Sequence, residues 1–275
     1  MSAAGPLPRR SAPQSAERSS TPAGIGALFR NQLLCGLTGF AALVAIWHGF
    51  TTSGLVSAIF LPSPRATLDA GVDGLASGDL LANLLTTVAH MVQGWLLASI
   101  VAIAIGSLIG ISTTARAYLQ PTLEFLRPLP SSATIPVAIA LVGFTPTMIL
   151  GVITFGSMWP TLLATVLGFS SIEPRLREVA ATLQMSRLAF IWKIGLPSAL
   201  PDIVAGMKLS VTVALILSVV TEMIAGQGGL GTTILMSARS FRTPELYSGI
   251  FLLGIVGLVS NYGLLLVERR TRKWR

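Results

Sequence analysis

Charged residues are scarce in this 275-residue chain: Asp, Glu, Lys and Arg make up 11% of it, whereas about 25% is usual for a soluble domain. Hydrophobic residues make up 52%. Several nearly uncharged stretches reach the roughly 20 residues that a helix needs to cross a hydrocarbon core of roughly 30 Å. The composition excludes an ordinary soluble fold and indicates a polytopic protein of the lipid bilayer.

Residues that bind metals or perform catalysis are also scarce. Cys35 is the only cysteine, so neither an internal disulfide nor a cysteine-based zinc site can form. His48 and His90 are the only histidines, and neither has a carboxylate or thiol at the spacing of a metal-binding motif. The motifs H-E-x-x-H and G-x-S-x-G are absent. The sequence predicts no metal site, no catalytic residue and no enzymatic activity for this chain.

A phosphate-binding loop is missing as well. None of the three lysines follows a glycine, which excludes G-x-x-x-x-G-K-[ST]. The segment GQGGLG at 226–231 fits G-x-G-x-x-G, but it follows an apolar helix instead of a strand. We therefore expect a flexible extracytoplasmic turn, part of an outer gate, and predict no cofactor-binding residue.

The apolar runs are continuous and do not alternate in polarity. Their backbone must satisfy its own hydrogen bonds, which favours helices over a β-barrel. We predict an all-α fold with six transmembrane helices. The predicted spans are 33–50, 84–111, a short run between Pro136 and Gly143, 148–169, 203–225 and 246–267. In the second span, Gly106 and Gly110 form a small-xxx-small pair typical of close helix packing.

Prolines interrupt the chain before the short third run. Pro128, Pro130 and Pro136 lack a backbone donor and must break or kink a helix. Irregular backbone inside a bilayer needs protein cover or a cavity. Pro136 is therefore one candidate for the translocation path or gate.

The basic residues are distributed unevenly between the two faces that six spans define. One face holds Arg9, Arg10, Arg18, Arg30, Arg116, Arg127, Arg175, Arg177, Arg187, Lys193, Arg269, Arg270, Arg272, Lys273 and Arg275; the other holds Arg65, Arg239 and Arg242. The positive-inside rule makes the first face cytoplasmic. We predict a disordered cytoplasmic tail at 1–30, a membrane domain at 31–275, both termini in the cytoplasm, and a multi-pass protein of the bacterial inner membrane. The net charge of +8 is then an orientation signal and does not indicate nucleic-acid binding.

Two ionisable residues lie in or near the fifth span. Lys208 is near the cytoplasmic end, from which its side chain can extend to the membrane surface. Glu222 sits deeper, next to Thr221, and a carboxylate inside a span is costly unless it faces a cavity or a partner. Glu222 and Thr221 are candidates for the translocation path or gate. The alternative is a structural brace, in which Glu222 bonds a neighbouring span or backbone freed at a helix end.

The longest cytoplasmic connection, about 171–194, reads as two short helices. Ser170 and Glu173 suggest a capping box, with Pro174 in the first turn, and Ser186 can cap the second helix. Gly195, Pro197 and Pro201 are expected to end that second helix before the fifth span. An apolar stripe follows the first helix: Leu176, Val179, Ala180 and Leu183. Connections this long are usually functional, so the segment either docks a partner or is a plain surface helix.

The stretch from Arg177 to Ser210 resembles the signature loop of importer permeases in the ATP-binding cassette superfamily. Glu178, Val179 and Ala180 occupy the family's Glu-Ala-Ala triplet, and Leu196-Pro197 its apolar-x-Leu-Pro ending. Valine replaces alanine in the triplet, and Gln184 stands where the family usually has glycine. Four further stretches resemble the nitrate, sulfonate, taurine and bicarbonate branch: LPSP at 61–64, FLRPLP at 125–130, IEPRLRE at 172–178 and GGLG at 228–231.

The resemblance implies a type I importer permease fold and a homodimer that encloses the translocation path. It implies that a cytoplasmic ATPase subunit, which carries the ATP and Mg, docks on the 171–194 coupling helix, and that a substrate-binding protein delivers small organic anions such as sulfonates or taurine, or nitrate. The implied coupling residues are Arg175, Arg177, Glu178, Ala180, Ala181, Gln184 and Arg187. The alternatives are a passive channel or secondary transporter, and a membrane scaffold or enzyme.

Overall fold

The computed structural model describes residues 25–126 and 130–271, and these residues form helices and connections without a strand. The chain divides into two compact units, 1–49 and 50–275. The first unit contains most of α1 (Ile25–Thr52), which begins inside the predicted tail and includes a candidate membrane span, Leu34–Thr52. The remainder of that tail, Arg127, Pro128 and the last four residues lie outside the described part of the chain.

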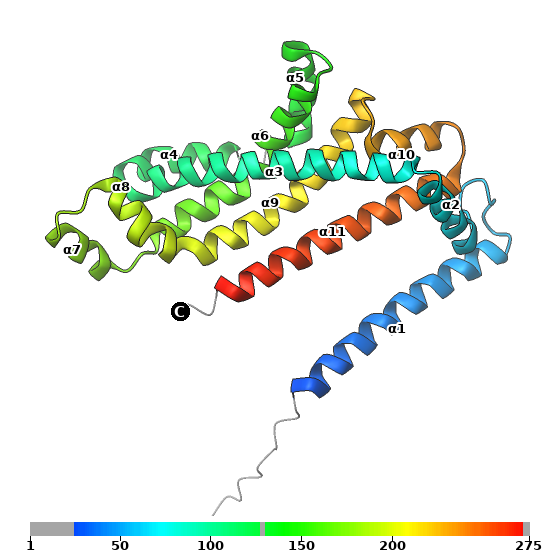
Figure 1. The fold of residues 1–275 in the computed structure, drawn as a ribbon, viewed down its shortest axis with the longest axis horizontal. Helices are drawn as coiled ribbons and strands as arrows, with labels where there is room; N and C mark the ends of the chain where they lie inside the picture. The colour runs from blue at the N-terminus through cyan, green and yellow to red at the C-terminus, as the bar shows by residue number, and fades with distance from the viewer. Residues whose placement is uncertain (1–24, 127–129, 272–275) are drawn as a thin grey trace, which may run out of the picture. The chain divides into compact units, whose positions relative to one another are not determined.

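Three long helices form the centre of the second unit: α3 (Asp79–Ile111), α6 (Pro146–Ser170) and α9 (Leu196–Ala225). Figure 1 shows them side by side. A Cβ atom on Gly106 would lie 2.7 Å from the Thr165 Cβ, and one on Gly110 would lie 2.5 Å from the Phe169 Cβ. No side chain fits there, so the predicted close approach at these two glycines is confirmed.

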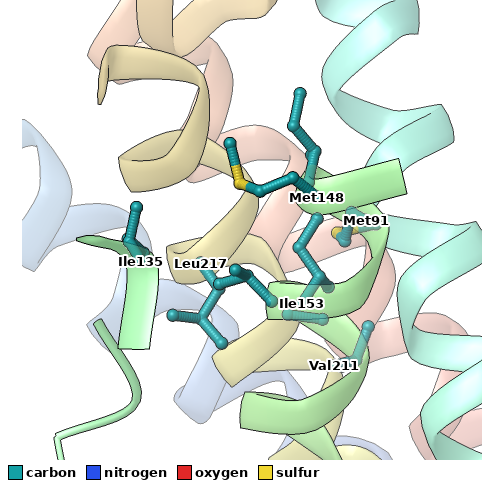
Figure 2. Packing of buried hydrophobic residues seen from close by; sticks show 9 residues of the cluster. Met91, Ile135, Met148, Ile153, Val211 and Leu217 are labelled. Atoms are coloured by element: carbon teal, nitrogen blue, oxygen red, sulfur yellow. The ribbon is translucent and has the colours of Figure 1, made fainter. Parts of the chain in front are cut away.

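The main hydrophobic cluster lies between these three helices (Figure 2). Met91 of α3, Ile153 of α6, and Val211 and Leu217 of α9 are almost fully buried in it. Ile135, the first residue of the short helix α5 (Ile135–Val142), joins the same cluster. The cluster therefore fixes the start of α5 to the three long helices.

Shorter helices and one further long helix pack around this centre. α11 (Thr243–Thr271) contacts α9, α2 (Pro64–Ala76) and α10 (Gly229–Arg239). α10 also packs on α3 and α9. Lys208 of α9 has a partner that was not predicted: its Nζ lies 3.5 Å from a carboxylate oxygen of Glu268 on α11. That partner is 60 positions away in the sequence, so spacing could not reveal it.

Six spans were predicted, and the described residues contain five helices long and apolar enough to cross a membrane. These are Leu34–Thr52, Asp79–Ile111, Pro146–Ser170, Arg187–Ala225 and Thr243–Arg270. A sixth is obtained if α4 (Thr113–Leu126) and the segment Ser131–Val142, which contains α5, count as one span bent by 87°. Pro130 precedes this second segment and Pro136 lies in the first turn of α5, as expected for a run broken by prolines.

The 171–194 loop contains the predicted pair of short helices, α7 (Pro174–Thr182) and α8 (Arg187–Phe190). The Ser186 hydroxyl accepts a hydrogen bond from the Ala189 N–H at 3.2 Å, which confirms the predicted cap of the second helix. The capping box on the first helix was wrong. Ser170 is the last residue of α6, where its hydroxyl donates to the Leu167 carbonyl, and Glu173 itself precedes Pro174 as the N-cap of α7.

The second short helix also does not end before the fifth span. It continues through a π-helical segment, η2 (Ile191–Gly195), into α9, and the continuous run from Arg187 to Ala225 is 39 residues long. Gly195 keeps a right-handed helical backbone, and Pro197 lies in the first turn of α9, where a missing N–H is least costly. The helix continues through Gly195 and Pro197 because packing against neighbouring helices stabilises this segment.

Candidate functional site

The 171–194 loop is anchored to the long helices by a second hydrophobic cluster. Ile172 and Ile191 from the loop and η2 are buried beside Phe169 of α6 and Ala199 and Ile203 of α9. Partly buried Ile111 of α3 and Phe190 of α8 pack against them. The loop is therefore an ordered extension of the helical bundle.

The exposed surface of α7 carries apolar side chains beside charged ones. Within the predicted stripe only Ala180 is buried, whereas Leu176, Val179 and Leu183 are 38%, 51% and 67% exposed. Leu188 at the start of α8 is also exposed, with 65% of its surface accessible. Because exposed apolar side chains rimmed by polar residues mark interaction sites, this surface is suited to a protein partner.

The charged residues of the loop do not all point the same way. Arg175, Glu178 and Arg187 are exposed, so their side chains can reach a partner. Arg177 is half-buried, and its Nη2 donates a 2.7 Å hydrogen bond to the Phe169 carbonyl at the end of α6. The structure thus separates Arg177 from the other charged coupling residues implied by the resemblance.

Gln184 makes the bend that ends α7. Its φ of 48° lies in the left-handed region that favours glycine. Its N–H donates to the Ala181 carbonyl, and the Met185 N–H donates to the Ala180 carbonyl, both at 3.0 Å. This is the Schellman arrangement of a helix C-terminus. Gln184 therefore adopts a backbone conformation that explains the glycine usual at this position of the family.

A second polar site surrounds Glu222 near the C-terminus of α9. Its side chain is fully buried. Oε2 accepts hydrogen bonds from the Thr87 hydroxyl at 2.8 Å and the Gly231 N–H at 3.1 Å. Oε1 lies 3.0 Å from Nδ1 of His90. Glu222 therefore joins α9 to both α3 and α10, the arrangement expected of the structural brace.

Side chains from other helices bond the first N–H groups of α10. Gly229 N–H donates to Oδ1 of Asn83, and Leu230 N–H donates to the Thr87 hydroxyl, at 3.1 and 2.8 Å. The bond from Gly231 to Glu222 completes the set. These groups have no partner within a helix, and a carboxylate is favourable at the positive end of the helix dipole. Contacts from α3 and α9 thus cap α10.

Two of the glycines at 226–231 allow this close packing, and three adopt the left-handed backbone of the turn. Gly226 ends α9 in the left-handed region at φ 65°, and Gly228 and Gly229 also have positive φ. A Cβ atom on Gly229 would lie 2.3 Å from the Glu222 carboxylate, and one on Gly231 would lie 2.3 Å from the Val219 carbonyl oxygen. Close packing at Gly229 and Gly231 and the hydrogen bonds of their N–H groups hold the second half of the turn, whereas an added Cβ would meet nothing within 4 Å at Gly226 or Gly228.

The three candidate path or gate residues lie in two places. Thr221 is fully buried beside Glu222, and its hydroxyl has no hydrogen-bond partner in the described chain. Pro136 is exposed at the start of α5. A bond from the side chain of Gln227 to the carbonyl of Phe144 ties the 226–231 turn to the connection between α5 and α6.

Sequence reasoning missed the α3 residues that bond Glu222 and the first N–H groups of α10. Asn83, Thr87 and His90 are more than 130 positions from their partners at 222 and 229–231. They recur at helix spacing on one face of an otherwise apolar helix, and that polar stripe was the available signal. Among the residues that the structure describes, no group of three or more His, Cys, Asp and Glu could hold a metal ion.

The fold and the site define a class: a polytopic helical membrane protein with an ordered loop outside its spans that presents an apolar face. Residues 81–273 match the family model described as the binding-protein-dependent transport system inner membrane component. The chain belongs to this family and is a permease subunit of an ATP-driven importer. The resemblance to importer permeases of the ATP-binding cassette superfamily is therefore confirmed.

Curated relatives cover most of the chain. SsuC of Bacillus subtilis strain 168, whose name assigns it provisionally to aliphatic sulfonate transport, is 33% identical over 87% of both chains. The taurine transport system permease protein TauC of Escherichia coli K12 is 27% identical over 88% of this chain and 90% of its own. The nitrate import permease protein NrtB of Leptolyngbya laminosa is 27% identical over 91% and 92%.

A chain of the MetNI methionine ABC transporter, solved in inward-facing conformations, has the same fold. It aligns with a TM-score of 0.60 and 18% identity, covering 71% of this chain and 97% of that one. The predicted importer permease fold is thereby confirmed.

Proposed function

We propose that this permease imports a small organic anion, such as a sulfonate or taurine, or nitrate, and that a separate ATPase drives it through the 171–194 loop. The substrate class rests on the names of the relatives, which cover aliphatic sulfonates, taurine, nitrate and bicarbonate. The coupling role rests on one observation: the loop is anchored to the long helices by buried side chains, yet it exposes apolar residues flanked by charged ones.

The energetics of this face favour a docked partner. Burying an exposed Leu or Val side chain stabilises by about 1.5–3 kcal/mol, so Val179, Leu183 and Leu188 together offer a substantial association energy. Arg175, Glu178 and Arg187 surround these side chains with charge, which gives a docking surface its orientation and specificity. In this proposal the ATP and Mg belong to the docked cytoplasmic ATPase.

A second copy of this chain would complete the translocation path. α5 exposes Val137, Leu141 and Val142 at 59%, 79% and 50%, although this helix belongs to the bent segment that counts as a span. Irregular backbone at the start of such a segment needs protein cover. A symmetric homodimer supplies that cover and places Pro136 at the subunit boundary.

The Glu222 site would serve the path from the opposite side of the membrane. The positive-inside rule puts both termini and the 171–194 loop in the cytoplasm of a bacterial inner-membrane protein, and the turn at 226–231 then faces outward. Glu222 acts there by holding that turn in place, with Thr221 buried beside it, as part of an outer gate. A substrate-binding protein delivers the substrate on this side.

Reconstitution with its ATPase tests the function. We expect the purified permease to retain an ATPase subunit and, in proteoliposomes with the binding protein, to accumulate taurine, an alkanesulfonate or nitrate only when ATP is supplied. Flux driven by an ion gradient through the permease alone would favour the secondary transporter instead.

A substitution on the loop tests the docking face. Leu183→Asp places a charge in the apolar face and should reduce ATPase co-purification by about tenfold or more, because burying an unpaired carboxylate is costly. Leu68→Asp is the matched control, since Leu68 is 59% exposed on α2, outside the loop. Equal ATPase retention by both variants would contradict docking on α7.

A further inference from the structure

Arg175 and Arg177 lie two residues apart on α7 and take different positions. Arg175 is exposed, whereas Arg177 is half-buried and donates to the Phe169 carbonyl at 2.7 Å. Residues two apart in a helix point to nearly opposite faces. A partner on the outer face of α7 can therefore reach Arg175, while Arg177 connects the same helix to the permease itself.

Phe169 is the point at which several long helices meet. Its side chain is fully buried. A Cβ atom on Gly110 of α3 would lie 2.5 Å from the Phe169 Cβ, and one on Gly195, next to α9, would lie 2.3 Å from the Phe169 ring. Phe169 itself belongs to α6. One residue thus contacts the C-terminal end of α3 and the segment that leads into α9, with no room for either to move independently.

The carbonyl of Phe169 is available to α7 because α6 ends there. The last carbonyls of a helix have no partner within it. Those of Leu167 and Gly168 accept bonds from Ser170 and Ser171. That of Phe169 accepts the guanidinium of Arg177, and a cation is favourable at the negative end of the helix dipole. The bond is therefore both charge-assisted and aligned with α6.

The side of α7 that faces α3 and α8 borders an open depression. The depression has a volume of about 220 Å³ and is lined by residues of α3, α7 and α8, among them Ile111, Ala180 and Phe190. Close packing transmits displacement, and an open depression offers α7 few packed neighbours there. The bond from Arg177 to the Phe169 carbonyl is therefore a direct link from α7 to the end of α6.

We propose that Arg177 is a positioning residue for transport, which transmits the movement of α7 through the Phe169 carbonyl to α3, α6 and α9. This inference rests on the proposed docking of an ATPase at the 171–194 loop, and it assigns Arg177 a role other than docking. The π-helical segment at 191–195, which ends at Gly195 beside the Phe169 ring, is the kind of irregular turn that often marks a functional position in a helix.

The test compares three variants of the full transporter, with ATPase and binding protein, in proteoliposomes. Arg177→Gln removes the charge and shortens the side chain, so the number of ATP molecules hydrolysed per substrate imported should rise about tenfold, as expected for loss of a charge-assisted hydrogen bond. ATPase co-purification should stay at the wild-type level. Arg177→Lys keeps a cationic donor and should give an intermediate ratio.

Arg175→Gln is the matched control, because it changes the exposed arginine of the same helix. It should weaken ATPase co-purification and so shows the effect of a lost docking contact, whereas Arg65→Gln, an exposed arginine on α2 outside the loop, should leave both co-purification and the ATP-to-substrate ratio unchanged. Loss of ATPase binding in Arg177→Gln, equal to that in Arg175→Gln, would overturn the proposal, as would a wild-type ratio in Arg177→Gln. If Arg177→Gln cannot be purified, a wild-type ratio in Arg177→Lys overturns it.

The outcome is distinguishable from failure of the proposed function. If the wild-type permease retains no ATPase, docking at the loop is wrong and the ratio cannot be measured. If the wild type retains its ATPase and imports substrate, only the ratio decides the role of Arg177. Gly110→Ala supplies an independent variant: its Cβ would displace Phe169 with Arg177 intact, and we expect the same uncoupling.

Discussion

A charged side chain fastens a short helix to the long helices at two places in the second unit, and the two fastenings differ in how completely they are enclosed. At α10, Glu222 is fully buried and bonds Thr87 and the Gly231 backbone beside His90. At α7, Arg177 is half-buried, and the outer side of the helix stays exposed, with apolar side chains beside Arg175 and Glu178. Figure 1 shows these helices far apart along the long helices of the second unit.

The comparison distinguishes a helix completed by its own chain from one that another chain would complete. The first N–H groups of α10 all find acceptors on α3 and α9. α7 has its inner bond and its C-terminal bend satisfied, but three apolar side chains of its predicted stripe remain accessible. At α10, the buried polar groups find their hydrogen-bond partners within the chain. At α7, exposed apolar side chains remain that a partner could bury.

The largest expected effect follows removal of the buried carboxylate. Glu222→Ala leaves the Thr87 hydroxyl, the Gly231 N–H and the His90 ring without their acceptor and should destabilise the permease by about 3–5 kcal/mol. The melting temperature in detergent should fall by on the order of 10 °C.

Glu173→Ala is the control for this variant, because Glu173 is exposed and its side chain does not cap α7. An unchanged melting temperature in Glu222→Ala would contradict the view that the enclosed bonds of Glu222 stabilise the protein more than the partly exposed contacts of α7 do.

A smaller effect is expected where α10 approaches α9. In Gly231→Ala the added Cβ would meet the Val219 carbonyl oxygen at 2.3 Å, and overpacking of this kind costs about 1–3 kcal/mol. The melting temperature should fall, although by less than in Glu222→Ala.

Gly263→Ala on α11 is the matched substitution, since no atom lies within 4 Å of its added Cβ. It should leave the melting temperature unchanged or raise it slightly, because alanine favours a helix more than glycine does. Equal melting temperatures for the two variants would indicate that α10 is not held closely.

The smallest effect is expected at the C-terminal bend of α7, where the substitution should stabilise the protein. Gln184→Gly relieves a left-handed backbone conformation that costs a non-glycine residue roughly 1–2 kcal/mol, so the end of α7 should be stabilised. Hydrogen exchange at the Gln184 and Met185 amides, which bond Ala181 and Ala180, should become slower.

Ala181→Gly is the control for this variant, since Ala181 lies within α7 in an ordinary helical conformation and glycine should accelerate exchange there. Faster exchange in Gln184→Gly would mean that the bend does not limit the stability of α7.

Much of the fold followed from local patterns. Long apolar runs predicted the long helices, and the spacing of Gly106 and Gly110 predicted a close approach that the structure contains. Ser186 predicted a helix start because a cap acts within four residues. The family loop around Glu178 was recognisable because its motif is contiguous.

The partners of individual side chains did not follow in the same way. Glu222 bonds residues 132 and 135 positions earlier, and Arg177 turns toward the end of α6 although it looked equivalent to Arg175. Gly195 and Pro201 read as helix ends but lie in a continuous helical run, because packing on neighbouring helices outweighs local propensity.

By itself, the sequence determined that the chain is an all-helical membrane permease with an ordered loop, since hydrophobic length, capping and a contiguous motif act over short stretches. Only the tertiary structure decided which polar groups are enclosed within the chain and which remain open to a partner. That choice depends on which distant helices meet, and a buried charge is stable only where such a meeting supplies its hydrogen bonds.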